Sequence, residues 1–465
     1  MKEWLRREPI VITAGKGAVL RDAKGREYLD ANASIWTNLH GHRHPKIDAA
    51  IRRQLNKIGH SSALGFANEP ASLLAERLVK SARLAKKRPT NRGPQLSKVF
   101  FSDDGSTAME VALKLAYEFA RRSGRSRRPR FLSLAGAYHG DTVGAVSLGH
   151  SDFFHKAYAG LLFKSDAVMA PYCYRCPFNR AKPERTDARE YRKCNWECAG
   201  KVEQRFAAQR KKGNPYTAMV VEPLMQGAAG MIPQPEGWLR RVAEIVRADG
   251  AQLIADEVMT GFGRTGQSSA INHQSPNSLF ACHREGVQPD FLCVAKGLTG
   301  GYLPMAATLT TSTVFDAFLG KYEEFKTFFH GHSYTGNQLG AAAAMASLDL
   351  LGKATNLRAR LKLEQTLRQE LKSLWPLENV GDVRQVGLVA GVELVRNWRT
   401  REAFDLRERA GIRVCEAMAR RGVLTRPIGS VLVLMPPYCT TPTQMRRMVG
   451  AMREAIQEIF EQRRA

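Results

Sequence analysis

One stretch of the sequence reads Leu253-Ile254-Ala255-Asp256-Glu257-Val258 and continues into a glycine-rich loop, Thr260-Gly261-Phe262-Gly263-Arg264-Thr265-Gly266. A second apolar run, Phe291-Leu292-Cys293-Val294-Ala295, ends in Lys296-Gly297. Each run has the length of a buried strand and delivers one charged residue at its carboxyl end. Ligands bind at that end of the strands in open α/β sheets, so we expect Asp256 and Lys296 to face one site.

An acid and a lysine presented in this way suit pyridoxal phosphate, in which the lysine attaches to the cofactor and the carboxylate pairs with the ring nitrogen. A phosphate site is also predicted where strand 98–101 passes through Asp104-Gly105-Ser106 into helix 108–116. The backbone N–H groups and the dipole of such a helix favour an anion, although a simple N-cap has the same appearance. Tyr138, beside a glycine after strand 131–134, is placed either to stack on a flat cofactor or to pack in its loop.

Length and composition indicate a globular protein with two domains. The chain has 465 residues, more than one hydrophobic core usually holds. It contains 70 Lys and Arg against 44 Asp and Glu, a net charge of +26, and the basic residues are spread along the whole chain. This spread favours a solvated basic surface that attracts anions over a nucleic-acid-binding patch. No long apolar run and no secretory signal are found, so we expect a cytoplasmic protein with no membrane contact.

Four of the eight cysteines lie in a polar insert at residues 171–200. Cys173, Cys176, Cys194 and Cys198 have the spacing C-x2-C-x17-C-x3-C, which is close to that of a four-thiolate structural zinc site. Reduced cysteines that simply pack in a loop are the alternative. A basic nucleic-acid-binding protein with a zinc knuckle at Cys173–Cys198 is a hypothesis from a different functional class.

The last hundred residues have a different pattern of predicted strands and helices from the middle of the chain. Short strands at 386–394 and 431–435 alternate with helices near 407–421 and 441–461. The pattern predicts a separate α+β lobe.

Taken together, these motifs resemble the class III pyridoxal-phosphate aminotransferases, from about residue 9 to the C-terminus. The Asp-Glu-Val motif with its Gly-Phe-Gly-Arg-Thr-Gly loop and Lys296 specify that class. Further similar segments are Asn38-Leu39-His40-Gly41-His42, Tyr138-His139-Gly140-Asp141-Thr142, Phe329-His330-Gly331-His332-Ser333-Tyr334-Thr335-Gly336-Asn337 and Thr425-Arg426-Pro427.

The resemblance implies fold type I of the pyridoxal-phosphate transferases, an α/β fold. The large domain would comprise residues 51–334, with a mostly parallel seven-stranded sheet and the cysteine-rich insert 171–200. The small α+β domain would combine residues 1–50 with 335–465. Members of the class are homodimers with a shared active site, which implies a second copy of this chain as the partner.

The resemblance also implies roles for individual residues. Lys296 would hold the cofactor and shuttle protons, and Asp256 would keep the ring nitrogen protonated. The residues implied to bind the cofactor are Gly105, Ser106, Tyr138, Asp256, Lys296 and, from the other subunit, Ser333. Those implied to bind the substrate are Trp36, Tyr138, Gly331 and Arg426.

Within the class, the histidine-rich and Arg-Pro segments are similar to the branch that acts in biotin biosynthesis. That branch converts 8-amino-7-oxononanoate to 7,8-diaminononanoate, with S-adenosylmethionine or lysine as the amino donor. Members usually carry an aromatic segment ahead of the matched region, and this sequence starts after it. Ile35 and Val433 stand where some members have a Trp and a Tyr, which leaves the donor open. The alternative is another ω-aminotransferase, acting on ornithine, 4-aminobutyrate or a diamine.

Overall fold

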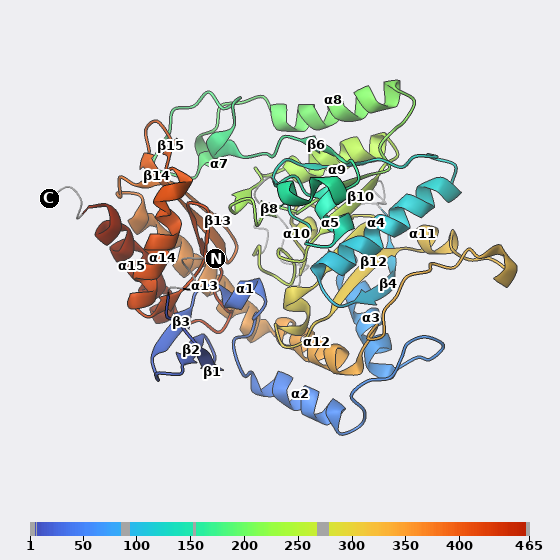
Figure 1. Ribbon diagram of the computed structural model, residues 1–465, viewed down its shortest axis with the longest axis horizontal. Coiled ribbons are helices and arrows are strands. Elements are labelled where there is room, and N and C mark those ends of the chain that lie inside the picture. Colours follow the sequence, from blue (N-terminus) through green and yellow to red (C-terminus); the bar gives the residue numbers. More distant parts are fainter. Residues whose placement is uncertain (1–4, 6, 85–93, 152–154, 267–278, 462–465) are drawn as a thin grey trace.

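The largest sheet carries most of the secondary structure of the middle of the chain. The computed structural model describes residues 5, 7–84, 94–151, 155–266 and 279–461 (Figure 1). In this sheet the strand order is β4 (Leu96–Ser102), β12 (Ala306–Thr311), β11 (Phe291–Val294), β10 (Gln252–Asp256), β7 (Ala218–Val221), β5 (Phe131–Leu134) and β6 (Asp166–Val168). β12 is antiparallel to both its neighbours, and the other pairs are parallel. The predicted fold class, with a mostly parallel sheet of seven strands, is therefore confirmed.

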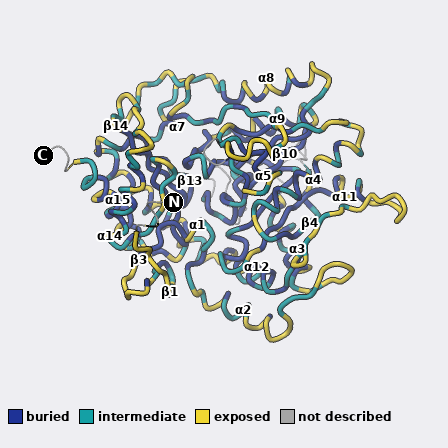
Figure 2. The backbone as a smooth tube through the Cα atoms, in the orientation of Figure 1, coloured by how far each residue is buried: buried dark blue, intermediate teal, exposed yellow. Residues whose placement is uncertain are grey.

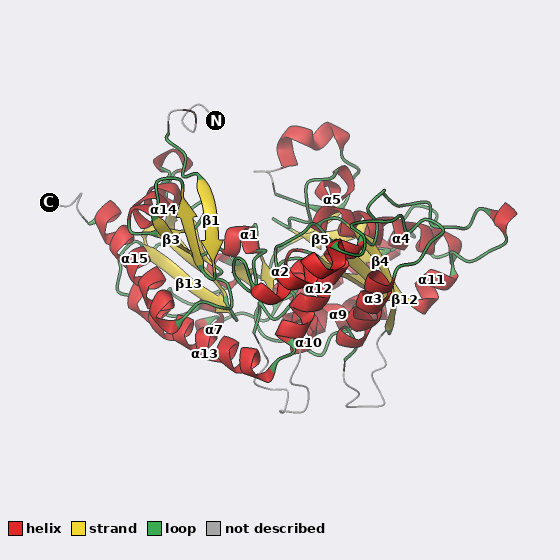
Figure 3. Ribbon diagram, turned by 90° about the horizontal axis from the view of Figure 1, so that it is seen from below, coloured by secondary structure: helices red, strands yellow, loops and turns green. Residues whose placement is uncertain are grey.

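Helices cover both faces of this sheet (Figure 3). One face packs Ile254 and Cys293 against α4 (Gly105–Arg122), and the other buries Leu253 and Ala255 in a second core. Successive residues of a strand point to opposite faces, so strands buried on both sides read as continuous apolar runs. The helices of the second face include α3 (Glu69–Ser81), α9 (Trp238–Ala248) and α12 (Gln338–Leu351), and α2 (Pro45–Leu55) packs on α12.

Two smaller sheets bring the ends of the chain together. One has the order β1 (Ile12–Lys16), β2 (Val19–Asp22), β3 (Glu27–Asp30) and β16 (Val423–Leu424), the last two paired in parallel. The other contains β13 (Val380–Val386), β14 (Val389–Asn397), β18 (Val431–Leu434) and β17 (Pro427–Ile428), with β15 (Glu402–Ala403) beside β14. The accompanying helices are α13 (Ala354–Leu371), α14 (Ala410–Arg420) and α15 (Pro442–Phe460). In Figure 1 the N-terminal strands of this lobe, in blue, lie beside its C-terminal elements, in red.

The remaining helices and short strands connect the sheets and helices described above. They are α1 (Ala33–Trp36), α5 (Val143–Leu148), η2 (Lys156–Leu161), η3 (Cys173–Arg175), α7 (Ala188–Tyr191), α8 (Glu197–Lys211), β8 (Met225–Gln226), β9 (Ile232–Pro233), α10 (Ala281–Arg284), η4 (Lys296–Thr299), α11 (Ser312–Asp316), η5 (Tyr322–Glu324), η6 (Lys372–Leu374) and η7 (Leu406–Glu408). Figure 2 shows the buried strands at the centre of each lobe and the exposed segments around them. Among the described residues, no helix is both long and apolar enough to cross a membrane.

The strand predicted at residues 386–394 proved to be the turn and second strand of a hairpin. β13 ends at Val386, and β14 begins at Val389 and runs antiparallel to it. Gly387 makes the tight turn with a φ of 60°, where a side chain would be strained. An added Cβ there would also lie 2.2 Å from the backbone nitrogen of Gly266. Two valine-rich strands joined by a glycine look like one continuous strand in the sequence.

A buried arginine ties the two lobes together. Arg384, on β13, donates through Nε to the Met231 carbonyl at 2.7 Å and through Nη2 to the Gly230 carbonyl at 2.5 Å. Its Nη1 pairs with Asp382 at 3.0 Å and with Glu393 at 2.6 Å. The guanidinium therefore bonds to both carboxylates of its own sheet and to two carbonyls of a loop of the large lobe.

Replacing this arginine is expected to destabilise the fold. Arg384→Met would leave the buried Asp382 without its cation and Glu393 with Arg175 as its remaining cation, a change that costs about 3–5 kcal/mol of unfolding free energy. Urea denaturation measures the loss. The matched control is Arg399→Met, whose pair with Glu378 is 62% and 50% exposed and should change stability by less than about 1 kcal/mol. Equal losses in both variants would contradict a special role for Arg384.

Candidate active site

A cavity of about 1500 Å³ lies at the carboxyl ends of β10 and β11, between the large sheet and the lobe formed by the chain ends. Strand ends from the middle of the chain supply one wall, and the segments around α1 and β17 supply the opposite wall. Of the residues predicted for the site, those that line the cavity are Trp36, Gly105, Ser106, Tyr138, Asp256, Lys296 and Arg426. Residues separated by almost 400 positions thus face the same space.

Lys296 stands directly after β11, where η4 begins. Its backbone has a φ of 42°, in the left-handed region that is disfavoured for a residue with a Cβ. Burial lowers the pKa of its ammonium, and the nearby carboxylates of Asp256 and Glu222 only partly oppose that shift. A lowered pKa increases the fraction of neutral amine, which is the form that acts as a nucleophile or base.

Asp256 forms a buried pair with a histidine of another strand end. His139 Nδ1 lies 2.8 Å from Asp256 Oδ2, and the backbone N–H of Val258 donates to Oδ1 at 3.1 Å. Burial alone would lower the pKa of His139, but the hydrogen bond and the charge of Asp256 outweigh it, so the pKa is raised. The pair fixes the direction of the Asp256 carboxylate at the end of β10.

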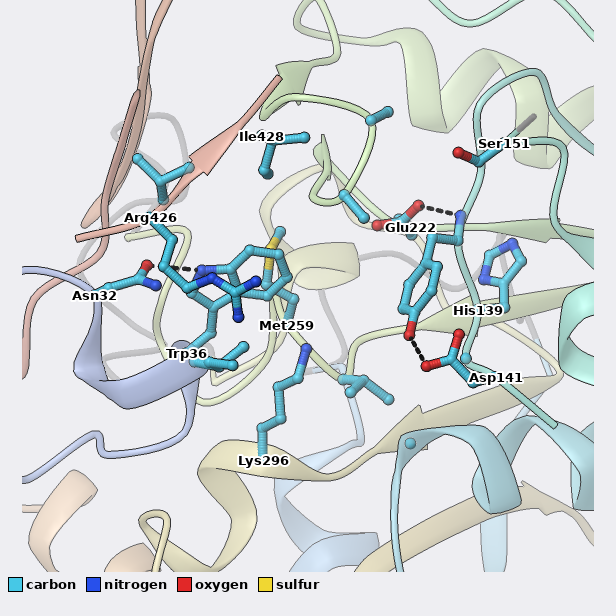
Figure 4. A pocket seen from close by; sticks show the side chains of 18 of the residues that line it. Asn32, Trp36, His139, Asp141, Ser151, Glu222, Met259, Lys296, Arg426 and Ile428 are labelled. Atoms are coloured by element: carbon cyan, nitrogen blue, oxygen red, sulfur yellow. Dashed lines mark hydrogen bonds between the residues drawn. The ribbon is translucent and has the colours of Figure 1, made fainter. Parts of the chain in front are cut away.

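Glu222 is a second buried acid next to this pair. Its carboxylate accepts the N–H of Gly227 at 2.8 Å and that of Tyr138 at 3.4 Å (Figure 4). Burial raises its pKa to about 7, more than the nearby His139 lowers it. Glu222 therefore titrates near neutral pH, whereas an exposed glutamate does not.

The N-terminus of α4 forms a cradle for an anion. The Asp104 side chain accepts the N–H of Thr107 at 2.8 Å and caps the helix, which leaves the Gly105 and Ser106 region facing the cavity. A Cβ on Gly105 would come within 2.7 Å of Val258, so only glycine allows this close approach. Helix N-termini with such exposed backbone groups bind phosphate groups.

Tyr138 lies on another side of the cavity. Its hydroxyl donates to Asp141 Oδ2 at 2.8 Å (Figure 4). Its ring is stacked on His155 with a 6.0 Å centroid distance. Burial and the carboxylate of Asp141 raise the pKa of the phenol, so it stays protonated. The hydrogen bond holds the hydroxyl and the stacking contact holds one face of the ring, so the other face is a rigid flat surface.

Trp36 and Arg426 belong to the opposite wall (Figure 4). The Lys296 Nζ lies 4.5 Å from the centroid of the Trp36 ring, and the Trp36 Nε1 donates to Asn32 Oδ1 at 2.9 Å. Arg426 has no hydrogen-bonding or ion-pair partner within the described part of the chain, and it faces the cavity. An arginine in that position can take a carboxylate in a bidentate manner.

Gly331 and Ser333 do not line this cavity. Both lie on an exposed segment, where the Ser333 carbonyl is 2.7 Å from the Nε2 of His60. The structure therefore separates these two residues from the other predicted site residues of the same chain.

The four clustered cysteines are free thiols. Across the described ranges, no group of three or more His, Cys, Asp or Glu side chains is placed to hold a metal ion. The Cys173 thiol faces the Pro171 carbonyl, whereas the Cys194 sulfur accepts from the Arg192 guanidinium at 3.1 Å. Burial raises the pKa of Cys173 to about 12 and that of Cys198 to about 11, so both thiols are protonated in the arrangement described. The predicted zinc site is not formed by this arrangement.

Three residues of the site were not singled out from the sequence. His139 and Asp141 lie in the segment noted for Tyr138, and Glu222 directly follows the buried apolar strand β7. A buried-strand pattern ending in an acid was the available signal for Glu222, since Asp256 has the same pattern. The pairing of His139 with Asp256 joins residues 117 positions apart and has no local signature.

The fold and the site together define a class of enzyme. A family model described as aminotransferase class-III matches residues 1–456. The chain belongs to the class III aminotransferases, as its motifs predicted.

Individual relatives cover nearly the whole chain. The protein of Geobacter sulfurreducens named adenosylmethionine-8-amino-7-oxononanoate aminotransferase is 45% identical over 465 residues, 99% of this chain and 94% of that protein. A protein of the same name from Methanocaldococcus jannaschii is 41% identical, covering 98% and 95% of the two chains. The crystal structure of the M. jannaschii protein is similar with a TM-score of 0.86 at 38% identity, covering 98% of this chain and 95% of that one. An amine transaminase from an uncultivated Pseudomonas species, solved in a PLP-bound form, has a TM-score of 0.84 at 31% identity, covering 98% and 96%.

The raised pKa of Glu222 predicts a pH dependence of stability. The pKa of Glu222 in the folded protein, about 7, exceeds its value in the unfolded chain. The protonated side chain therefore contributes fully to the free energy of unfolding below about pH 4.5, and this contribution is lost as the pH rises through 7. Glu222→Gln removes that titration. Between pH 5 and 8 the variant should therefore gain about 2–3 kcal/mol of unfolding free energy relative to the wild type. Urea denaturation of the cofactor-free protein at both pH values measures the difference, and a pH-independent difference would contradict the assignment.

Proposed function

We propose that this protein is a pyridoxal-phosphate-dependent aminotransferase that converts 8-amino-7-oxononanoate to 7,8-diaminononanoate, with S-adenosylmethionine as the amino donor. The observation that carries the proposal is the meeting of Lys296, Asp256 and the α4 cradle with Arg426 in one cavity. The names of the two relatives support the choice of substrate and donor.

The side chains present fit pyridoxal phosphate. The backbone at Gly105 and Ser106 would hold the phosphate, with Ser333 of the partner subunit, and Tyr138 would stack on the ring. Asp256, held by His139, would pair with the protonated ring nitrogen. When bound, this cofactor supplies an electron sink that makes the carbon bearing the amine acidic.

The chain supplies the proton transfers and the substrate contacts. Lys296 Nζ, made less basic by burial, would first bond to the cofactor and then, once released, take the proton from the donor carbon. In the first half of the reaction this proton would go to the cofactor, and in the second half the same amine would carry a proton from the cofactor to the keto carbon of the substrate. Arg426 would bind the carboxylate of the keto acid at the far wall, and Trp36 would cover the amine and exclude water.

Lys296 gives the sharpest test of the reaction. With 8-amino-7-oxononanoate and S-adenosylmethionine, the wild type should form 7,8-diaminononanoate, detected by mass spectrometry. Lys296→Ala should lower turnover about a thousandfold or more, since both attachment and proton transfer are lost. Lys212→Ala, at an exposed lysine after α8, is the control and should retain full turnover.

The donor and the substrate are tested in the same assay. Product with lysine but not with S-adenosylmethionine would replace the proposed donor. An absence of diaminononanoate with every donor, together with turnover of ornithine, 4-aminobutyrate or a diamine, would replace the proposed substrate. Full turnover by Lys296→Ala would overturn the mechanism itself.

We also propose that the chain forms two domains, each built around its own sheets and core. The chain ends would form the small domain and the segment between them the large one, with boundaries near residues 51 and 334. A separate core supports this division, since Leu29 and Ala31 are buried with residues of α13, α14 and α15. The α12 helix, which follows residue 334, packs its buried face into the core of the large sheet, so the packing favours a second boundary after α12, near residue 352, over one at 334.

A homodimer is proposed as the working assembly. Large apolar side chains are exposed on the segments 64–66 and 322–334, among them Leu64 at 88%, Phe66 at 73% and Phe329 at 68%. In Figure 1 the chain after α11 extends away from the body. Exposed apolar groups of this size mark interaction sites, and a second copy would also bring Ser333 to the site.

Light scattering after size-exclusion chromatography tests the assembly. The wild type should have twice the mass of the 51.7 kDa chain. The variant with both Leu64→Asp and Phe66→Asp should shift towards the monomer, because charges would be buried without partners. Val11→Asp, at another exposed apolar residue, is the control and should remain dimeric. A wild-type monomer would contradict the proposal.

A further inference from the structure

The loop that carries Trp36 has a strained backbone. Ala33, Ser34 and Trp36 have φ values of 45°, 62° and 65°, although none of them is glycine. Ser34 combines its φ with a ψ of −89°, close to the rare γ-turn conformation. Residues with a Cβ avoid this region, so three of them within four positions persist only where surrounding interactions enforce them.

The carboxylate of Asp30 supplies these interactions. Asp30 ends β3, is 2% exposed, and accepts the N–H of Ser34 through both oxygens, at 3.1 and 2.9 Å. It also accepts the N–H of Asn32 at 3.2 Å. A single side chain thus folds the next four residues back over the end of its own strand.

His42 holds Asp30 from the other side. Its Nε2 lies 2.9 Å from Asp30 Oδ2, and its backbone exchanges two hydrogen bonds with Gly17, at 2.8 and 3.0 Å. The Asp30 backbone is itself fixed, because its N–H donates to the Ala18 carbonyl at 2.9 Å. The carboxylate is therefore anchored to the N-terminal sheet before it reaches the loop.

The strained loop ends at the cavity. Asn32 and Trp36 are joined by the 2.9 Å bond between Oδ1 and Nε1, so the indole is oriented by the same turn that Asp30 closes. Figure 4 shows the Lys296 amine pointing towards this indole, with Nζ 4.5 Å from the ring centroid. Trp36 is thus aimed at Lys296 by a turn whose closing carboxylate, Asp30, is not among the residues that line the cavity.

We propose that Asp30 is a positioning residue of the active site: with His42, it holds residues 32–36 in the strained conformation that places the Trp36 indole over Lys296 and so shapes the face where the amino donor binds. The inference rests on the proposed aminotransferase function, but not on the identity of the keto acid. Asp30 does not line the cavity, so its effect passes through Trp36.

The same sheet offers a matched control. Asp22 ends β2, is 3% exposed, and accepts the N–H groups of Lys24 and Arg26 at 3.0 and 2.9 Å. It closes a turn as Asp30 does, but that turn carries no residue of the cavity. Asp22→Asn therefore reports what the loss of a buried turn-closing carboxylate does to the fold alone.

Hydrogen–deuterium exchange of the cofactor-free protein gives the first readout. In Asp30→Asn, exchange of the backbone amides in residues 32–36 should rise by about tenfold, because the Ser34 amide loses its two-oxygen acceptor. In Asp22→Asn, exchange should rise at residues 24–26 and remain unchanged at residues 32–36. Unchanged exchange at 32–36 in Asp30→Asn would overturn the proposal, whatever the enzyme's substrate.

A double-mutant cycle on the cofactor-loaded protein gives the second readout. The rate of the first half-reaction is followed by cofactor absorbance with any amine donor that the protein accepts. Asp30→Asn should lower kcat/KM for the donor about 10–100-fold, mostly through KM, with the bound cofactor unchanged. In a Trp36→Ala background the same substitution should change kcat/KM by less than about twofold, since its only target is already gone.

A rescue completes the test. Glycine adopts the Ser34 conformation without steric cost, so Ser34→Gly in the Asp30→Asn background should recover about tenfold in kcat/KM. Ser34→Gly should not recover any activity lost by Asp22→Asn. Losses that multiply independently for Asp30→Asn and Trp36→Ala would show a general effect on folding and overturn the proposal. If no amine donor reacts, the proposed function fails, and the exchange measurement still decides the role of Asp30.

Discussion

Two ionisable side chains, Asp256 and Lys296, are withdrawn from water at the carboxyl ends of neighbouring parallel strands, and the structure around them has to compensate for their desolvation. His139 does so for Asp256 with a buried hydrogen bond of 2.8 Å. Lys296 is compensated less fully, and its pKa falls. Burial that is a cost to stability therefore produces the reactivity of the site, because it makes the amine available as a base.

The second wall of the cavity depends on how the chain ends are attached to the large sheet. β3 and β16 pair in parallel, so Trp36 after one strand and Arg426 after the other are delivered to the same side of the site. Arg384 joins β13 to the carbonyls of Gly230 and Met231, next to the cavity-lining residues Ala229 and Ile232. The distance between the two walls is thus set by backbone pairing and by one buried guanidinium.

Local patterns were sufficient where a structural element carries its own signal. Buried apolar strands ending in Asp256 and Lys296, and the capped start of α4, predicted the α/β fold and the cofactor class, whereas Trp36 and Arg426 were expected in the site only from the family resemblance. Local patterns gave a wrong prediction where the structure of a segment depends on residues distant in the sequence. The spacing of the four cysteines predicted zinc, but Cys173 and Cys194 face other groups, and the strand at 386–394 contains a glycine turn.

The sequence by itself predicted a pyridoxal phosphate site, because the residue types at strand ends are local properties, and the resemblance of its motifs to a known family indicated the class of enzyme. Only the tertiary structure decided which side chains meet. His139 reaches Asp256 and Trp36 reaches Lys296 because strands distant in sequence are adjacent in the sheets. Asp30 holds a strained loop through contacts that have no pattern in the sequence. Such pairings, and the pKa shifts that follow from burial, arise only when the chain has excluded water from the site.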